Sequence, residues 1–140
     1  MKVNMMLCDA AQVADGKLYI LGGGWSILVP KPIPTAIALR FEVDWMEAET
    51  DHHWILSLID ADGESMKIDS GEGMMPIQLE GDFRVGRPND LPPGASIDMV
   101  VAINLSPLPF LPSTRYTWVM NIDGVTHEDW SVTFTTKALD

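Results

Sequence analysis

Hydrophobic and polar residues alternate along most of this chain, so that every second residue falls on the same face. Residues 36–44 show the pattern well: Ile37, Leu39, Phe41 and Val43 share one face, and the charged residues lie on the other. This period of two is typical of a β-strand with one buried and one solvated face. Strands are expected at residues 2–8, 17–21 with a continuation at 25–29, 36–44, 52–60, 65–68, 77–85, 96–105, 116–122 and 130–134.

Turn residues and prolines divide these strands. Asp15-Gly16, Asp60–Gly63 and Asp123-Gly124 have the composition of hairpin turns. The proline-rich segments 30–34 and 107–112 cannot join a regular ladder, so we expect each of them to cross from one sheet to the other. The segment 86–94 reads as a surface connection, and residues 52–60 carry apolar residues on both faces, as a central strand would.

Three segments are ambiguous. Residues 10–13 fit a helical turn or a short connection, and we favour the connection. Residues 45–50 fit a helical turn or a loop, and residues 69–76 carry no clear period and are expected to form a loop. No segment longer than about ten residues has a helical period. The pattern predicts a single all-β domain over residues 1–140, a two-sheet antiparallel β-sandwich, Ig-like or jelly-roll-like, with about eight strands and little helix.

Three consecutive glycines, Gly22 to Gly24, interrupt the strand that starts at Lys17. Consecutive backbone amides can cradle a phosphate, but the lysine and hydroxyl residue that end a P-loop are missing, and no helix follows. Glycine inside a strand also allows a sharp bend, because no Cβ stands in the way. We therefore interpret the run as an architectural bend that steers a long strand between the sheets.

The chain is strongly acidic, with a formal net charge of -11 and a pI near 4.4. Nine scattered basic residues do not make a nucleic-acid-binding surface, and the same charge disfavours anionic membranes. The single cysteine, Cys8, excludes an intrachain disulfide. No apolar run approaches the roughly 18 residues of a membrane span, and the N-terminus does not resemble a secretory signal. We expect a cytoplasmic protein.

No cofactor is expected from the candidate ligands in the sequence. His52, His53 and His127 lack the paired spacing of a zinc site, and adjacent strand residues point to opposite faces. Acidic residues in the predicted loops are weak calcium candidates, because calcium takes six or more oxygen ligands, but Asp-Gly is first of all a turn former. These weak candidates are Asp60, Asp62, Glu64 and Asp123.

Nothing in the sequence singles out a catalytic group. The chain has no Gly-x-Ser-x-Gly elbow, and Cys8 falls on a predicted strand, where a small buried apolar residue is the default. We therefore expect a protein without enzymatic activity.

Large apolar residues in presumed loops favour contact with another protein. The chain holds five Trp and nine Met, and several of its large apolar residues fall outside the alternating positions. Such loops can instead fold back and cap the ends of the sandwich. The predicted contact residues are Trp45, Met46, Met74, Met75 and Phe110. We expect a module that associates with itself as a homo-oligomer or docks on a larger assembly; the alternative is a small-molecule or carbohydrate-binding domain that uses aromatics such as Trp45.

Two sequence patterns resemble those of a small uncharacterised bacterial family. The first runs from Cys8-Asp9-Ala10 through Gly16-Lys17-Leu18-Tyr19-Ile20-Leu21-Gly22-Gly23-Gly24-Trp25, and the second is Arg115-Tyr116-Thr117-Trp118 followed by Ile122-Asp123-Gly124. Ser113-Thr114 stand where a glycine is common in that family. The resemblance spans nearly the whole chain. It implies a shared fold and transfers no catalytic residue, because the family is a domain of unknown function.

Overall fold

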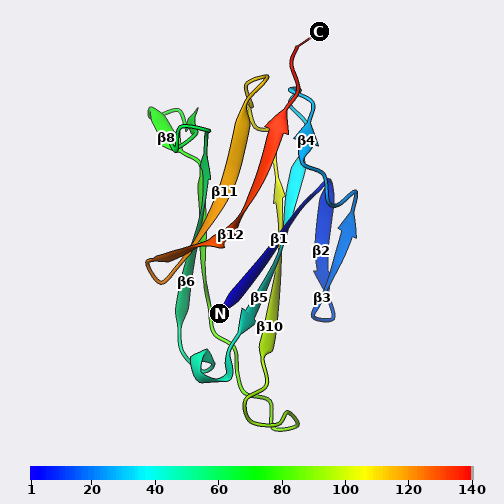
Figure 1. Ribbon diagram of the computed structural model, residues 1–140, viewed down its shortest axis with the longest axis vertical. Coiled ribbons are helices and arrows are strands. Elements are labelled where there is room, and N and C mark those ends of the chain that lie inside the picture. The colour runs from blue at the N-terminus through cyan, green and yellow to red at the C-terminus, as the bar shows by residue number, and fades with distance from the viewer. Residues whose placement is uncertain (140) are drawn as a thin grey trace.

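The computed structural model describes residues 1–139, and β-strands dominate it (Figure 1). Trp45–Glu47 forms a single turn of 3-10 helix, η1. The strands are β1 (Lys2–Cys8), β2 (Ala10–Ala14), β3 (Lys17–Leu21), β4 (Ile27–Leu28), β5 (Thr35–Val43), β6 (His52–Ile59), β7 (Lys67–Asp69), β8 (Met74–Pro76), β9 (Gln78–Phe83), β10 (Ile97–Leu105), β11 (Arg115–Ile122) and β12 (Val125–Thr136).

Two main sheets pack against each other as a sandwich. The three-stranded sheet has the order β1-β5-β10, and the five-stranded sheet has the order β4-β12-β11-β6-β9. All pairs are antiparallel except β4 with β12, which run parallel. The predicted all-β sandwich is confirmed, but the predicted strand number is wrong, since residues 1–139 contain twelve strands rather than about eight. The additional strands come mainly from two small hairpins, β2–β3 and β7–β8.

The alternation of the sequence places the core where it was expected. On β5 the side chains of Leu39, Phe41 and Val43 are fully buried between the sheets. From the other sheet, Trp118 and Met120 on β11 pack against these side chains. Phe134 on β12 and the buried face of β6 complete the same core. The expectation that β6 is buried on both faces is only half right, because Ile55 and its outward-facing neighbours are just half-buried. No second layer within residues 1–139 covers that side of the five-stranded sheet.

Both proline segments cross between the sheets, as predicted. The first, residues 30–34, leads from β4 in the five-stranded sheet to β5 in the three-stranded sheet. The second, residues 107–112, leads back from β10 to β11. Each crossing lacks ladder pairing because proline has no N–H to donate.

Residues 10–14 are not a connection or a helical turn, and the prediction for them is wrong. They form β2, which pairs with β3 and lies against the outward side of the three-stranded sheet (Figure 1). Close packing is possible because small residues meet there, namely Cys8, Ala11, Ala36 and Ala38. The amide of Asn104 on β10 then holds β2: its Nδ2 donates to the Ala11 carbonyl at 2.8 Å, and its Oδ1 accepts from the Ala11 N–H at 3.1 Å.

The second small hairpin also departs from the expectations. Residues 65–68 do not form a return strand along β6, which they meet in a single bridge between Ser65 and Ile59. They turn away because β9 occupies that edge of β6 from His52 to Ser57. Within the segment 69–76, expected to be a loop, Met74–Pro76 forms β8 and pairs with β7.

The closing hairpin of β11 and β12 forms as predicted, with Asp123 and Gly124 at positive φ in its turn. Its return arm is longer than expected and begins at Val125. The register shifts between Val119 and Asn121, so that residues 127–130 bulge out of β12.

The glycine run joins two layers of the molecule. It follows β3, in the small hairpin, and leads to β4, in the five-stranded sheet. The N–H of Gly24 donates to the Leu7 carbonyl at 2.8 Å, and both Gly22 and Gly24 have positive φ. The run is therefore a bend between layers, although the strand before it belongs to neither main sheet.

Replacing Gly23 with valine is expected to lower the free energy of unfolding by about 1–2 kcal/mol. A Cβ at this position would lie 2.8 Å from Ile20 Cγ2 and 2.9 Å from Met6 Sδ, so these side chains would have to move. Gly86→Val is the matched control, since a Cβ there meets nothing within 4 Å. Urea denaturation measures both variants, and equal stabilities would show that the bend tolerates a side chain.

Candidate functional site

Exposed large apolar side chains concentrate near the β2–β3 hairpin. Among the described residues fifteen such side chains are exposed, and eight of them lie between Met6 and Ile33. Five lie on or beside the hairpin, and we name them the hairpin surface: Tyr19 and Leu21 on its outward side, and Met6, Val13 and Ile20 on the side where the hairpin meets the three-stranded sheet. A large exposed apolar patch on a protein surface commonly marks an interaction site.

The geometry of the hairpin explains this exposure. Ala11 and Leu18 face the three-stranded sheet, whereas Tyr19 and Leu21 alternate to the outward side, where they are 54% and 71% exposed. Ile20 and Met6 lie side by side, since a Cβ at Gly23 would lie 2.8 Å from Ile20 Cγ2 and 2.9 Å from Met6 Sδ. A two-stranded hairpin that packs on a sheet can bury only one of its faces.

The hairpin carries few charges. Between Asp9 and Gly24 the charged residues are Asp9, Asp15 and Lys17, which give a formal charge of -1, and the whole chain carries -11.

Sequence reasoning missed the hairpin surface because it placed these residues on predicted strands or in a short connection and expected contact residues in the loops. The missed signal is in Leu18-Tyr19-Ile20-Leu21, which is apolar at every position and does not alternate. A strand with two apolar faces needs a covering layer on both sides. Within residues 1–139 only one side has such a layer, and the sequence pattern does not show which.

The predicted contact residues do not form one patch. Trp45 is half-buried, and the guanidinium of Arg87 lies 5.4 Å from its ring centroid. Its neighbour Met46 is 83% exposed. Met74 and Met75 are exposed on β8, at the opposite end of the sandwich from η1 (Figure 1). Phe110 turns inward, with its ring centroid 5.1 Å from that of Tyr116 and 5.2 Å from that of Phe134.

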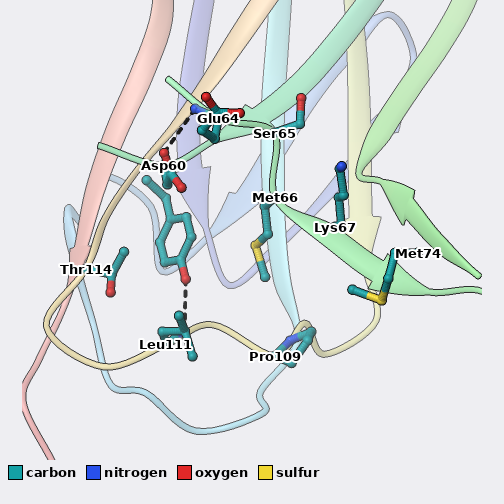
Figure 2. A pocket seen from close by; sticks show the side chains of 10 residues that line it. Asp60, Glu64, Ser65, Met66, Lys67, Met74, Pro109, Leu111 and Thr114 are labelled. Atoms are coloured by element: carbon teal, nitrogen blue, oxygen red, sulfur yellow. Dashed lines mark hydrogen bonds between the residues drawn. The ribbon is translucent and has the colours of Figure 1, made fainter. Parts of the chain in front are cut away.

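The structure does bring two of the apolar loops together around a groove of about 500 Å³ (Figure 2). Met74 lies on one side, and Pro109 and Leu111 lie on the other. The hydroxyl of Tyr116 accepts a hydrogen bond from the Leu111 N–H at 2.9 Å. Polar residues complete the lining: Asp60, Glu64, Ser65, Lys67 and Thr114.

The four weak calcium candidates are not brought to one place. Asp60 Oδ1 accepts from the backbone N–H groups of Asp62 and Glu64, at 2.9 and 3.0 Å, which stabilises the turn itself. Asp123 contacts two histidines elsewhere. In residues 1–139 no group of three or more His, Cys, Asp or Glu side chains is placed to hold a metal ion.

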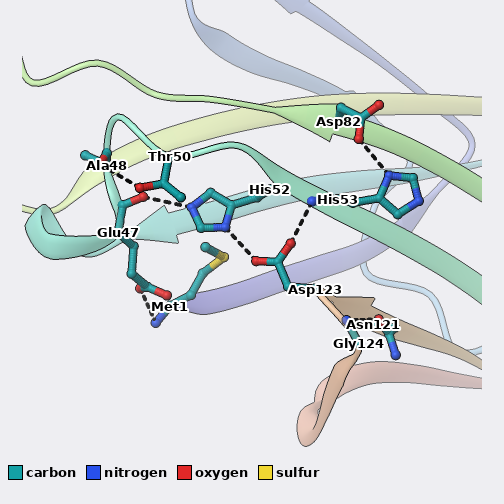
Figure 3. A network of polar contacts seen from close by, with 10 residues as sticks. All are labelled: Met1, Glu47, Ala48, Thr50, His52, His53, Asp82, Asn121, Asp123 and Gly124. Atoms are coloured by element: carbon teal, nitrogen blue, oxygen red, sulfur yellow. Dashed lines mark hydrogen bonds and ion pairs between the residues drawn. The ribbon is translucent and has the colours of Figure 1, made fainter.

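A polar network joins η1, β6, β9 and the closing hairpin (Figure 3). His52 Nδ1 lies 2.7 Å from Asp123 Oδ2, and its Nε2 lies 2.8 Å from the Glu47 carbonyl oxygen. His53 meets Asp82 at 2.7 Å through Nδ1 and Glu80 at 3.1 Å through Nε2. Each ring therefore has both nitrogens against acceptors, an arrangement that only the doubly protonated imidazolium satisfies.

The pKa values of these groups are shifted accordingly. Burial lowers the pKa of His52, but the hydrogen bonds to Asp123 and to the Glu47 carbonyl together outweigh it, so that the pKa lies above its usual value. The pKa of His53 is raised by hydrogen bonds to Asp82 and then Glu80. The hydrogen bond from His52, followed by that from the His53 backbone, lowers the pKa of Asp123.

The remaining candidates occupy structural positions. Cys8 is fully buried at the end of β1, and burial, followed by the charge of Asp9, raises the pKa of its thiol. His127 lies in the bulge of β12, with its Nδ1 3.6 Å from Asp129 Oδ2.

Comparison with known protein families identifies the family of this chain. A family model described as a family of unknown function (DUF6941) matches residues 4–135. No curated protein and no solved structure matches the chain. Among the described residues no helix is long and apolar enough to span a membrane.

Proposed function

Since this chain belongs to the family of unknown function DUF6941, which assigns it no activity, we propose from its surface that the protein is a non-enzymatic module that binds other proteins. One observation carries the proposal, namely the hairpin surface with its concentration of exposed apolar side chains. The partner docks over Tyr19 and Leu21, on the outward side of the hairpin.

A partner that covers these exposed apolar side chains would gain binding free energy. Covering one exposed leucine side chain contributes about 1.5–3 kcal/mol, and Leu21 is 71% exposed. Tyr19 adds an aromatic ring, which loses little conformational entropy on binding and is common among the energetically dominant residues of interfaces.

Site-specific photo-crosslinking tests this proposal. A photoreactive amino acid replaces Leu21 in the full chain, in the cells that naturally produce it, and Val125 serves as the control because it is 58% exposed but lies outside the hairpin surface. We expect a discrete covalent adduct from position 21 and none from position 125. No adduct from position 21, or the same adducts from both positions, would count against the proposal.

A small-molecule-binding domain is the second candidate, and the groove between Met74 and Leu111 favours it. Its size suits a small ligand, and apolar and polar groups converge on it. Trp45 does not line this groove, so the groove does not support the idea of a carbohydrate stacked on that ring. Native mass spectrometry of protein purified from its own cells would reveal a retained ligand. Met66 also lines the groove, and Met66→Trp, which fills it, should release the ligand.

A further inference from the structure

Strand β10 forms an open edge of the three-stranded sheet. It pairs with β5 without a break along all nine of its residues, and it is the last strand of that sheet. On an edge strand of an antiparallel sheet, every second residue turns its N–H and C=O away from the ladder. Within residues 1–139 no backbone group of another segment pairs with this free side. The edge therefore presents a row of unpaired donors and acceptors.

The side chains of β10 also lack cover. Met99, Val101 and Ile103 pack against the core but are only half-buried. Leu39, which lies opposite Val101 on β5, is fully buried. Leu7 on β1, at the other edge of the same sheet, is only 2% exposed. The β10 edge thus leaves one side of the core uncovered, and the β1 edge does not.

The other sheet edges are protected against pairing with a further strand. On β1 the Leu7 carbonyl already accepts a hydrogen bond from the Gly24 N–H. Strand β4 has only two residues, and β9 carries the exposed carboxylates of Glu80 and Asp82. Charges, prolines, bulges and short length are the usual means of protecting an edge. β10 is long, has no proline and no bulge, and contains one charged residue, Asp98.

An unpaired strand edge selects an extended polypeptide, because another strand matches its alternating donors and acceptors. Strand β10 of a second copy fits in an antiparallel register that pairs all nine residues, with Val101 opposite its own copy. This register keeps core-facing residues opposite core-facing residues. It also places Asp98 opposite Asn104. The two Asp98 carboxylates then lie about 20 Å apart along the ladder, well beyond the screening length of about 8 Å at physiological salt.

We propose that β10 pairs with β10 of a second copy about a two-fold axis at Val101, so that the two three-stranded sheets join into one continuous sheet. The dimer satisfies the free backbone groups of both edges and covers the half-buried side chains of β10. The contact at its centre is uncharged, since Asp98 lies near the end of the strand. Tyr19 and Leu21 point away from this sheet, so the outward side of the hairpin stays free for the partner proposed above.

Sedimentation equilibrium of the full chain over a range of concentrations tests the dimer. We expect the mass to rise from 15.5 kDa towards twice that value. Val100→Lys places two lysines diagonally across the two-fold axis, with their strand positions about 7–8 Å apart, and should weaken association at least about tenfold. Asn4→Lys is the matched control, because Asn4 and Val100 lie opposite the same residue, Arg40, on the two sides of β5. Circular dichroism verifies that both variants fold.

The substitution Val101→Cys gives a second measurement, which tests the register. Directly opposed strand residues have Cα atoms about 4.5–5.5 Å apart, so the two introduced thiols should form an intermolecular disulfide under mild oxidation. Met99→Cys is the control on the same face, because its two copies lie roughly 14 Å apart in this register. The native Cys8 does not interfere, because it is fully buried. A protein that stays monomeric at all concentrations, equal weakening by the two lysine variants, or equal disulfide yields from the two cysteine variants would overturn the proposal. None of these results bears on crosslinking from Leu21, so the two proposals fail independently.

Discussion

Replacing Gly81 with valine is expected to destabilise the protein by about 3 kcal/mol, the upper end of what overpacking a core costs. Gly81 lies opposite Trp54 in the pairing of β9 with β6, and a Cβ at this position would lie 2.9 Å from the indole Nε1 and 3.0 Å from two ring carbons. The indole cannot easily retreat, because it is buried and packs against Phe41, with the two ring centroids 6.4 Å apart. Urea denaturation measures the loss.

A double-mutant cycle separates this clash from other effects of the substitution. In a Trp54→Leu background the ring is gone, so Gly81→Val should cost much less than in the natural protein. Gly86→Val again serves as the control without a clash. Equal costs in the two backgrounds would show that the indole does not require the glycine.

Replacing His52 with leucine is expected to cost about 2 kcal/mol near pH 6, even though leucine is of suitable size for the buried position. The variant loses the hydrogen bonds to the Asp123 carboxylate and to the Glu47 carbonyl, together with the stacking of the imidazole on Phe83 at 5.1 Å between centroids. Thermal unfolding followed by circular dichroism measures the change.

The same network predicts how stability depends on pH. Because the pKa values of His52 and His53 are raised in the folded protein, their contribution is complete below about pH 6.5, the ordinary pKa of histidine, and is lost as the pH rises through the folded values. The lowered pKa of Asp123 makes its contribution complete above about pH 4, and that contribution is lost as the pH falls through the folded value. Stability should therefore be greatest between about pH 4 and 6.5.

Variants of the network test this dependence directly. His52→Leu and Asp123→Asn should both flatten the fall in stability above pH 6.5, since each removes one partner of the same ion pair. Asp62→Asn is the control, because Asp62 lies in an exposed turn outside the network. If the two network variants retain the pH slope of the natural protein, the histidines do not account for it.

The elements that the sequence predicted well are those whose signal is local. Alternation on residues 36–44 and 116–122 reports directly which face is buried, because side chains of a strand point to opposite sides in turn. Asp-Gly turns and proline crossings are equally local, since they depend on the backbone preferences of a few residues. These features determine a sandwich with two crossings between its sheets.

Pairing partners could not be predicted in the same way. Residues 65–68 have the composition of a return strand, but β9 competes for the same edge of β6 and pairs along more of it. Residues 10–14 become a strand only because small side chains on β1 and β5, and the Asn104 amide on β10, offer β2 a surface to pack on. Both outcomes depend on residues far away along the chain.

The fold class and the acidic character of this protein follow from the order and the number of its residues. Which of its apolar residues remain exposed depends on how distant elements pack. Leu21 and Leu39 are equally apolar on their strands, but Leu39 lies between two sheets and Leu21 lies outside the last layer. Exposure depends on what packs against a face, and that neighbour comes from distant parts of the chain.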